Sequence, residues 1–164
     1  MVKKIFLILF IINLLIPNEV KIDTQPNKSI VNSNIIGKII IPKIDLEKDL
    51  YSINSEENNI EKNVTILKES VFPDKENSLM LIAAHSGTGN IAYFNKLDRL
   101  KEKDEVYLII NDNYYIYEIK DIWEEKKSGY INLNKEIKKQ LVLTTCSPNN
   151  NGYQLVINCI EKDV

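Results

Sequence analysis

Short apolar runs rich in β-branched residues recur along this chain of 164 residues, and they constrain its fold more than any other feature. Such runs favour strands, and Pro, Asn, Asp and Gly stand between most of them, where these residues end strands and form turns. We predict seven or eight short strands, including residues 35–41, 50–53, 79–84, 106–110, 114–123, 141–145 and 153–160. This count predicts an all-β fold, a closed barrel, with a sandwich of the same strands as the alternative.

Turn and helix signals refine this prediction. Asn111-Asp112-Asn113 separates two of the strands and predicts a β-hairpin. Apolar residues at positions 91, 94, 97 and 100 predict a short helix over 91–100. Residues 54–61 are polar, and we interpret them as a single helical turn or a loop. The barrel should therefore carry one or two short helices.

The first twenty residues form a separate segment. Lys3 and Lys4 precede the apolar run 5–16, which Pro17 ends, and this order is typical of a secretory signal. No small-x-small cleavage site follows, so we expect an uncleaved membrane anchor over 1–20, although a membrane span needs about 20 residues. A cleaved signal and a buried N-terminal helix are the alternatives. The lysine pair places the N-terminus in the cytoplasm and the rest of the chain outside the cell.

The chain therefore divides into three predicted parts. Residues 21–34 contain Pro, Asn and Ser without a sustained apolar period, as in a linker. Residues 35–164 remain as the folded domain, on the extracellular face of the cell membrane.

Composition excludes several classes of function. The 21 basic and 23 acidic residues give a net charge of −2, so there is no basic excess to attract a nucleic acid. One His and two Cys cannot assemble a zinc cluster, and we expect no metal and no cofactor. The acids Glu56, Glu57, Glu124 and Glu125 leave a calcium site open, but solvated charge is the preferred interpretation.

Two residue types that can carry chemistry each follow an apolar strand. His85 comes directly after 79–84, and Cys146 comes directly after 141–145. Two strand ends can meet at one rim of a barrel, and a nucleophilic Cys needs an adjacent base or cation. His85 and Cys146 are therefore a candidate catalytic pair. The alternative is a surface histidine and a small core cysteine.

Cys159 lies on the last predicted strand. Strand alternation places it on the opposite face from Gln154, Val156 and Asn158. An extracellular compartment would permit a Cys146–Cys159 disulfide. We prefer a buried free thiol, because the disulfide would consume the one candidate nucleophile.

Four segments, taken in order, carry a family resemblance. They are Gly-Lys-Ile-Ile-Ile-Pro-Lys-Ile within 36–44, Leu-Ile-Ala-Ala-His at 81–85, the run 93–106 with its Phe, Leu, Leu, Asp and Val, and Leu-Thr-Thr-Cys at 143–146. The chain resembles the sortases, the membrane-anchored cysteine transpeptidases of Gram-positive bacteria, over about residues 35–160. Two positions in or next to these segments depart from the family pattern: Lys103 stands where Gly is usual, and Val142 where Thr is usual.

The resemblance implies a closed sortase barrel and a mechanism. Cys146 would attack a carbonyl of an LPXTG-like sorting motif, and His85 would protonate the departing amine. Thr145 would contact the acyl group. An amine of a peptidoglycan precursor or a pilin would then resolve the thioester. The implied partners are secreted proteins with a C-terminal sorting motif, and the sortase class stays open.

Gln154 is the main departure from the family. Sortases place an Arg on the final strand before an apolar pair, where it is thought to support the oxyanion, and here Gln154 precedes Leu155-Val156. Arg99 is the one Arg of the chain, and Lys162 is the one basic residue after Cys146. A Gln amide can still donate a hydrogen bond, but it lacks the charge of a guanidinium.

Three functional hypotheses follow. The first is an active sortase-type transpeptidase that uses His85, Cys146 and Gln154. The second is a catalytically weakened sortase-fold protein that binds peptides or cell-wall partners. The third is a cysteine hydrolase on an unrelated fold.

Overall fold

The computed structural model describes residues 34–162, so the predicted anchor at 1–20 and nearly all of the predicted linker at 21–34 lie outside the described residues. Within residues 34–162, no helix is long and apolar enough to cross a membrane. The elements are β1 (Ile35–Ile41), η1 (Pro42–Ile44), β2 (Leu46–Tyr51), β3 (Thr65–Ile66), β4 (Leu79–Ala83), η2 (Leu97–Arg99), β5 (Glu105–Ile110), β6 (Asn113–Lys126), β7 (Gln140–Cys146) and β8 (Tyr153–Glu161), where η marks a 3₁₀ turn.

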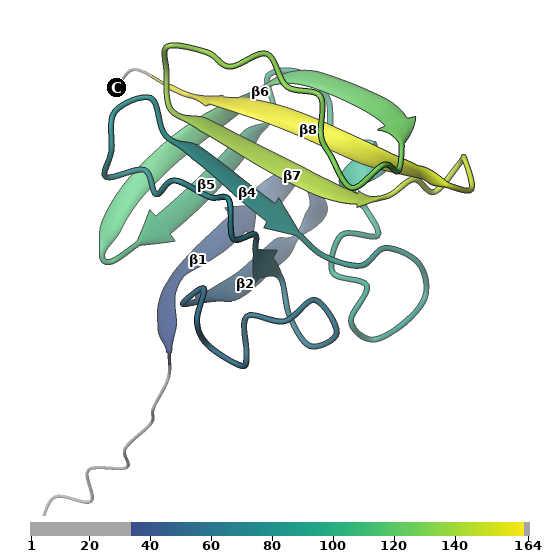
Figure 1. Cartoon of the computed structure of the whole chain (residues 1–164), viewed down its shortest axis with the longest axis horizontal. Helices are drawn as coiled ribbons and strands as arrows, with labels where there is room; N and C mark the ends of the chain where they lie inside the picture. The colour runs from purple at the N-terminus through teal and green to yellow at the C-terminus, as the bar shows by residue number, and fades with distance from the viewer. Residues whose placement is uncertain (1–33, 163–164) are drawn as a thin grey trace, which may run out of the picture. The chain divides into compact units, whose positions relative to one another are not determined.

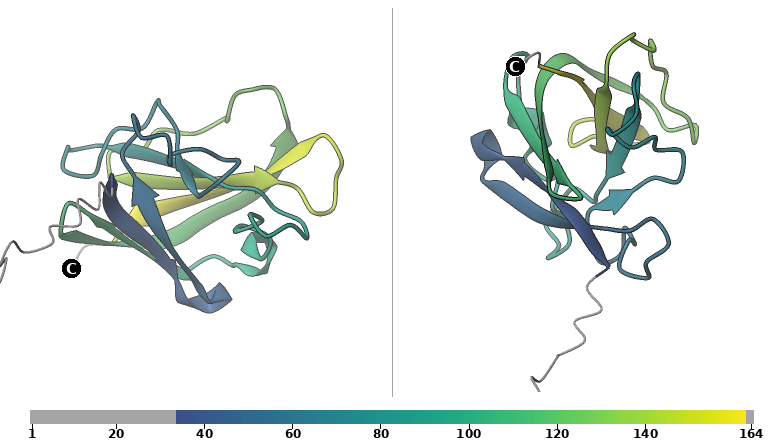
Figure 2. Two further views of the ribbon diagram at one scale, coloured as in Figure 1. Left: turned by 90° about the horizontal axis from the view of Figure 1, so that it is seen from below. Right: turned by 90° about the vertical axis from the view of Figure 1, so that its left-hand side faces the viewer.

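The eight strands form one sheet in the order β2-β1-β5-β6-β8-β7-β4-β3. The sheet curls until its two edge strands, β2 and β3, contact each other, which gives a nearly closed barrel (Figure 1 and Figure 2). Neighbouring strands are antiparallel except for β4 and β7, which are parallel. The structure confirms the predicted all-β barrel, because a single curled sheet replaces the two stacked sheets of a sandwich.

Alternation along β8 sorts its side chains between the barrel core and the outer face. Ile157 and Cys159 are buried in the hydrophobic core. Val156 and Asn158 are also buried, but they lie outside that core. The loop 127–139, which joins β6 to β7, passes over this outer face (Figure 1). The predicted separation of Cys159 from its neighbours on β8 is therefore correct.

Gly37 is required by a close approach between β1 and β5. A Cβ built on this residue would lie 1.9 Å from the carbonyl oxygen of Ile109. No side chain fits there unless the backbone moves. The glycine of the first strand therefore lets these two strands pack as they do.

The predicted hairpin is present, and the turn explains its sequence. β5 and β6 pair up to Ile110 and Asn113, which leaves Asn111 and Asp112 as a two-residue loop. Both residues have positive φ, 47° and 64°. This is the backbone of a type I′ turn, and Asn and Asp tolerate it better than most residues.

The helix predicted over 91–100 is wrong in extent, since this segment forms turns and a single 3₁₀ turn, η2. Its apolar residues Phe94, Leu97 and Leu100 are buried as the pattern suggested. Their strict spacing of three matches the 3.0 residues per turn of a 3₁₀ helix better than the 3.6 of an α-helix. Because 3₁₀ runs are short, the segment packs its apolar residues without forming a longer helix.

Three strands differ from the prediction. β2 begins at Leu46 rather than at residue 50, β6 runs to Lys126 rather than to residue 123, and β3 (Thr65–Ile66) was not predicted. The missed start of β2 is charged, with Lys38 of β1 bound to Glu47 at 2.5 Å. Charged residues are common on edge strands because they discourage pairing with another chain. They also hide the apolar alternation that marks a strand.

Candidate active site

The parallel pair β4 and β7 brings both candidate catalytic residues to one edge of the barrel. Ala83 pairs with Thr144, so the two strands end side by side (Figure 1). Beyond the ladder, the Thr145 hydroxyl donates to the carbonyl of Ala84 at 2.7 Å. The Ser86 hydroxyl donates to the carbonyl of Cys146 at 2.9 Å. These bonds fix the backbones that carry His85 and Cys146 against each other.

The His85 ring is held by an acid from another segment. Its Nε2 lies 3.1 Å from Oε1 of Glu61, which comes from the loop between β2 and β3. The side chain of His85 is 34% exposed and that of Glu61 is 71% exposed. The backbone carbonyl of His85 accepts a hydrogen bond from Phe94 at 2.9 Å. His85 therefore has a fixed backbone and a carboxylate that can pair with its imidazolium.

The sulfur of Cys146 has a cation as its neighbour. Nζ of Lys127 lies 2.8 Å from Sγ of Cys146, and both residues are exposed. Among the described residues, the hydrogen-bond partner of the His85 ring is Glu61 and not Cys146. The thiol is thus open to solvent and in contact with a positive charge, an arrangement that suits a nucleophilic cysteine.

Cys159 plays no part in this site. It is fully buried and unpaired, as expected, and burial raises the pKa of its thiol. In the ladder of β7 and β8, Cys159 pairs with Leu141, whereas Cys146 pairs with Gln154 at the other end. The two sulfurs cannot form a disulfide across that separation.

A hollow of about 420 Å³ opens beside the thiol. Its lining includes Cys146, Thr145 and Ser86 together with the apolar side chains of Phe94, Leu155 and Pro148. Thr145 lines the hollow, and its hydroxyl is engaged with the carbonyl of Ala84. The size and mixed lining suit a short stretch of peptide.

Gln154 lies directly opposite Cys146 on β8. Its Nε2 donates to Oε1 of Glu125 at 3.0 Å and to the carbonyl of Tyr130 at 2.9 Å. An amide has two N–H donors, so both are engaged. Gln154 thus braces the loop after β6, and it would have to release one bond before donating to an oxyanion.

The acids Glu124 and Glu125 are engaged with protein donors. Hydrogen bonds from Ser147, at 2.6 Å, and from Asn150 lower the pKa of Glu124. Burial alone would raise the pKa of Glu125, but hydrogen bonds from Asn132 and Gln154 outweigh it and lower the pKa. In the part of the chain that the structure describes, no three His, Cys, Asp or Glu residues are grouped to hold a metal ion.

Sequence reasoning missed two residues of this site, Glu61 and Lys127. Both belong to loops that lack a motif, and neither is near His85 or Cys146 in the sequence. Lys127 reaches Cys146 across β8, which separates β6 from β7, and Glu61 reaches His85 from the loop between β2 and β3. No local sequence signal identifies either residue.

Comparison with known proteins identifies the protein family. The family model of the sortase domain matches residues 39–160. The match covers most of the folded part, and the chain belongs to the sortase family. This excludes the hypothesis of an unrelated fold.

Individual relatives agree with this assignment. The chain is 27% identical over 132 residues to sortase A of Bacillus anthracis, a match that covers 80% of this chain and 61% of that protein. It therefore spans less than two thirds of that relative. A lid mutant of sortase A from Corynebacterium diphtheriae superposes with a TM-score of 0.70 at 26% identity, covering 79% of this chain and 71% of that one. Sortase C of Clostridium perfringens gives a TM-score of 0.69 at 26% identity, covering 80% and 72%.

Proposed function

We propose that this protein is a cysteine transpeptidase that cleaves an LPXTG-like sorting motif and transfers the secreted protein to an amine. The observation that carries the proposal is the placement of His85 and Cys146 at adjacent ends of parallel strands, with Cys146 lining a hollow of about 420 Å³. Family membership supports the reaction class. The sortase C of C. perfringens was solved with a C-terminal cell wall sorting motif, which supports the substrate class.

The proposed reaction has two halves. The thiolate of Cys146 attacks a backbone carbonyl, so an S–C bond forms and the carbonyl electron pair moves to oxygen. When this intermediate collapses, the C–N bond breaks and the leaving amine takes a proton from the His85 imidazolium. A thioester on Cys146 remains. The acceptor amine then attacks the thioester carbonyl, gives a proton to His85 and releases the thiolate.

The proposed acceptor is the amine of a peptidoglycan precursor or of a pilin. One solved sortase C of Streptococcus pneumoniae is described in terms of pilin substrate specificity, which supports including a pilin amine. We also propose that residues 1–20 anchor the protein in the cell membrane with the barrel outside the cell. The basis is the charged start and apolar run of that segment.

A second candidate function rests on Gln154. Its two N–H groups are engaged by Glu125 and Tyr130. Losing one oxyanion donor typically costs about 100- to 1000-fold in rate. A sortase-fold protein with that loss would bind a sorting peptide or a cell-wall partner with little turnover.

Intact mass of the full chain, incubated with a pool of sorting-type peptides, distinguishes the two functions. Wild type, Cys146→Ala and Gln154→Arg should be run together, with Cys159→Ala as the matched cysteine control. An adduct of the N-terminal peptide fragment on wild type and Cys159→Ala, absent from Cys146→Ala, supports the transpeptidase. An adduct on Gln154→Arg alone supports the weakened protein. If no variant forms an adduct with peptides that bind, the transpeptidase is overturned.

A further inference from the structure

The sulfur of Cys146 meets a cation from a strand that is not its neighbour in the sheet. β8 lies between β7, which carries Cys146, and β6, which ends just before Lys127. The lysine side chain reaches across the end of β8 and places Nζ 2.8 Å from Sγ. The ammonium is thus within hydrogen-bonding reach of the sulfur, and a nearby cation favours the thiolate over the thiol.

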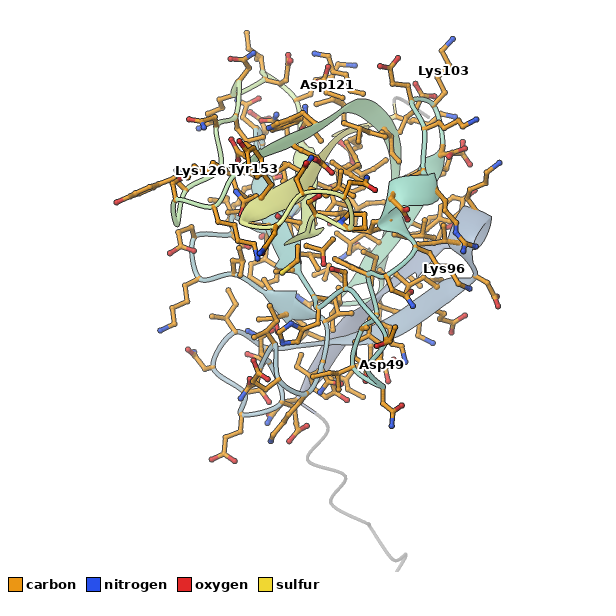
Figure 3. All side chains as sticks on the ribbon, turned by 90° about the vertical axis from the view of Figure 1, so that its right-hand side faces the viewer. Asp49, Lys96, Lys103, Asp121, Lys126 and Tyr153 are labelled. Carbon is orange, nitrogen blue, oxygen red and sulfur yellow. The ribbon has the colours of Figure 1, made fainter. Side chains whose placement is uncertain are left out.

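The backbone of Lys127 is fixed where this reach is possible. Its N–H donates to the carbonyl of Gly152 at 2.9 Å, which extends the ladder of β6 and β8 by one step. Just before it, Lys126 pairs with Tyr153, and Figure 3 shows these two residues side by side. Strand alternation then places Lys127 on the same face as Glu125, which is aligned through β8 with Cys146. The fold therefore directs this lysine, and not Lys126, towards the thiol.

The nearby acids do not compete for this lysine. Glu124 accepts hydrogen bonds from Ser147 and Asn150, and Glu125 accepts them from Asn132 and Gln154. Across residues 34–162, the bonds recorded for the Lys127 ammonium lead to the sulfur and to no carboxylate. Its positive charge is thus available to the nucleophile.

We propose that Lys127 is a catalytic residue that holds Cys146 as a thiolate and remains a cation throughout the reaction. This inference rests on the proposed function for its catalytic consequence. When the sulfur's electron pair forms the S–C bond, the negative charge moves to the carbonyl oxygen, which is then joined through one carbon to the sulfur that the ammonium contacts. Lys127 keeps its protons, since His85 supplies the one that the leaving amine takes. Lys127, which directly follows β6, then supplies the positive charge that the family's Arg would carry at the position of Gln154.

The test measures the thiol without any peptide. The full chain is alkylated with iodoacetamide at pH 6.5 and followed by intact mass, for wild type, Lys127→Met, Lys127→Arg and the charge-matched control Lys126→Met. Cys159 is buried, so a second adduct reports unfolding and a single adduct reports Cys146. Absorbance at 240 nm, compared with Cys146→Ala, measures the thiolate directly.

Lys127→Met should alkylate about three- to tenfold more slowly and lose most of the thiolate absorbance. Lys127→Arg should recover most of the rate, and Lys126→Met should match wild type. With a sorting peptide, Lys127→Met should lower kcat with little change in KM. The proposal is overturned if Lys127→Met alkylates within twofold of the wild-type rate. It is also overturned if Lys127→Arg alkylates no faster than Lys127→Met. If alkylation behaves as expected but no peptide forms a thioester, Lys127 stands as the thiolate partner and the transpeptidase function fails.

Discussion

Gln154 sits opposite Cys146 in the ladder of β7 and β8, yet its amide donates both hydrogens elsewhere, to Glu125 and to the carbonyl of Tyr130. The residue that the family pattern places beside the thiol thus secures the loop over the outer face of the barrel. The positive charge in contact with the sulfur comes from Lys127 instead. The cation in contact with the thiol therefore comes from a different segment than the family pattern predicts.

Removing the carboxylate of Glu61 should slow the proposed transfer modestly. Glu61→Ala deletes the oxygen 3.1 Å from His85 Nε2, so the ring loses its orienting partner. Because Glu61 is largely exposed, we expect a fall in kcat of at most about fivefold, with KM unchanged. Steady-state kinetics on a sorting peptide measures this split. The control is Glu57→Ala, which removes an acid of the same loop that pairs with Lys62; an equal loss there would contradict the role of Glu61.

Thr145→Val should destabilise the barrel at the join between β4 and β7. The substitution keeps the shape but removes the hydroxyl that donates to the buried carbonyl of Ala84 at 2.7 Å. An unsatisfied buried acceptor costs about 1–3 kcal/mol, and about 2–4 °C of Tm per kcal/mol is typical of a chain this size. Thermal unfolding measures the shift. Thr145→Ser keeps the donor and should stay near wild type; a Tm as low as that of Thr145→Val would show that the methyl group matters more than the bond.

Gly37→Ala should destabilise the barrel far more than Gly89→Ala. The new Cβ would lie 1.9 Å from the carbonyl oxygen of Ile109, and β1 or β5 must move to accept it. We expect a loss of about 3 kcal/mol in the free energy of unfolding, measured by denaturant titration. Gly89→Ala is the matched control, because a Cβ there meets no atom within 4 Å. Equal effects at the two sites would mean that the clash is relieved at no cost.

Acid should loosen the loop after β6 before it unfolds the barrel. The pKa of Glu125 is held below its ordinary value of 4.5 in the folded protein, so this group adds stability above that value. The contribution is lost as the pH falls through the lowered pKa, when the carboxyl gains a proton and its bonds from Asn132 and Gln154 weaken. Hydrogen exchange of residues 130–133 between pH 6 and pH 3 should show this loss. In Glu125→Gln, the protection of these residues from exchange should depend less on pH than in wild type. An unchanged dependence would show that protonation of Glu125 does not loosen the loop.

The strands were predictable where apolar and β-branched residues cluster. Runs such as 79–84 and 141–145 appear as β4 and β7 within a residue at each end. The charged start of β2 and the two-residue β3 were missed, because a partly exposed edge strand needs few apolar residues. The apolar residues at 91, 94, 97 and 100 predicted a helix; three of them, Phe94, Leu97 and Leu100, are buried, but burial alone does not require a helix.

Of the candidate site, the sequence indicated His85 and Cys146, and the structure brings the strands that precede them to one edge of the barrel. His85 and Cys146 each follow a strand and lie within recognisable motifs, so local sequence was sufficient to select them. Lys127 and Glu61 reach the site through strand order and loop path, which are properties of the whole barrel. The cation beside the sulfur is Lys127, which lies just after β6 and not on the strand that follows Cys146.

The parallel pairing of β4 and β7 also determines when the protein can become reactive. Ala84 and Thr145, which join the two strand ends, are 61 residues apart in the sequence. Contacts between such distant segments close a long loop and tend to form late in folding. A partly folded chain would present Cys146 without the hollow or the charged side chains around it. Assembly of the candidate site, with the thiol, the hollow and the charged side chains in place, therefore depends on completion of the barrel.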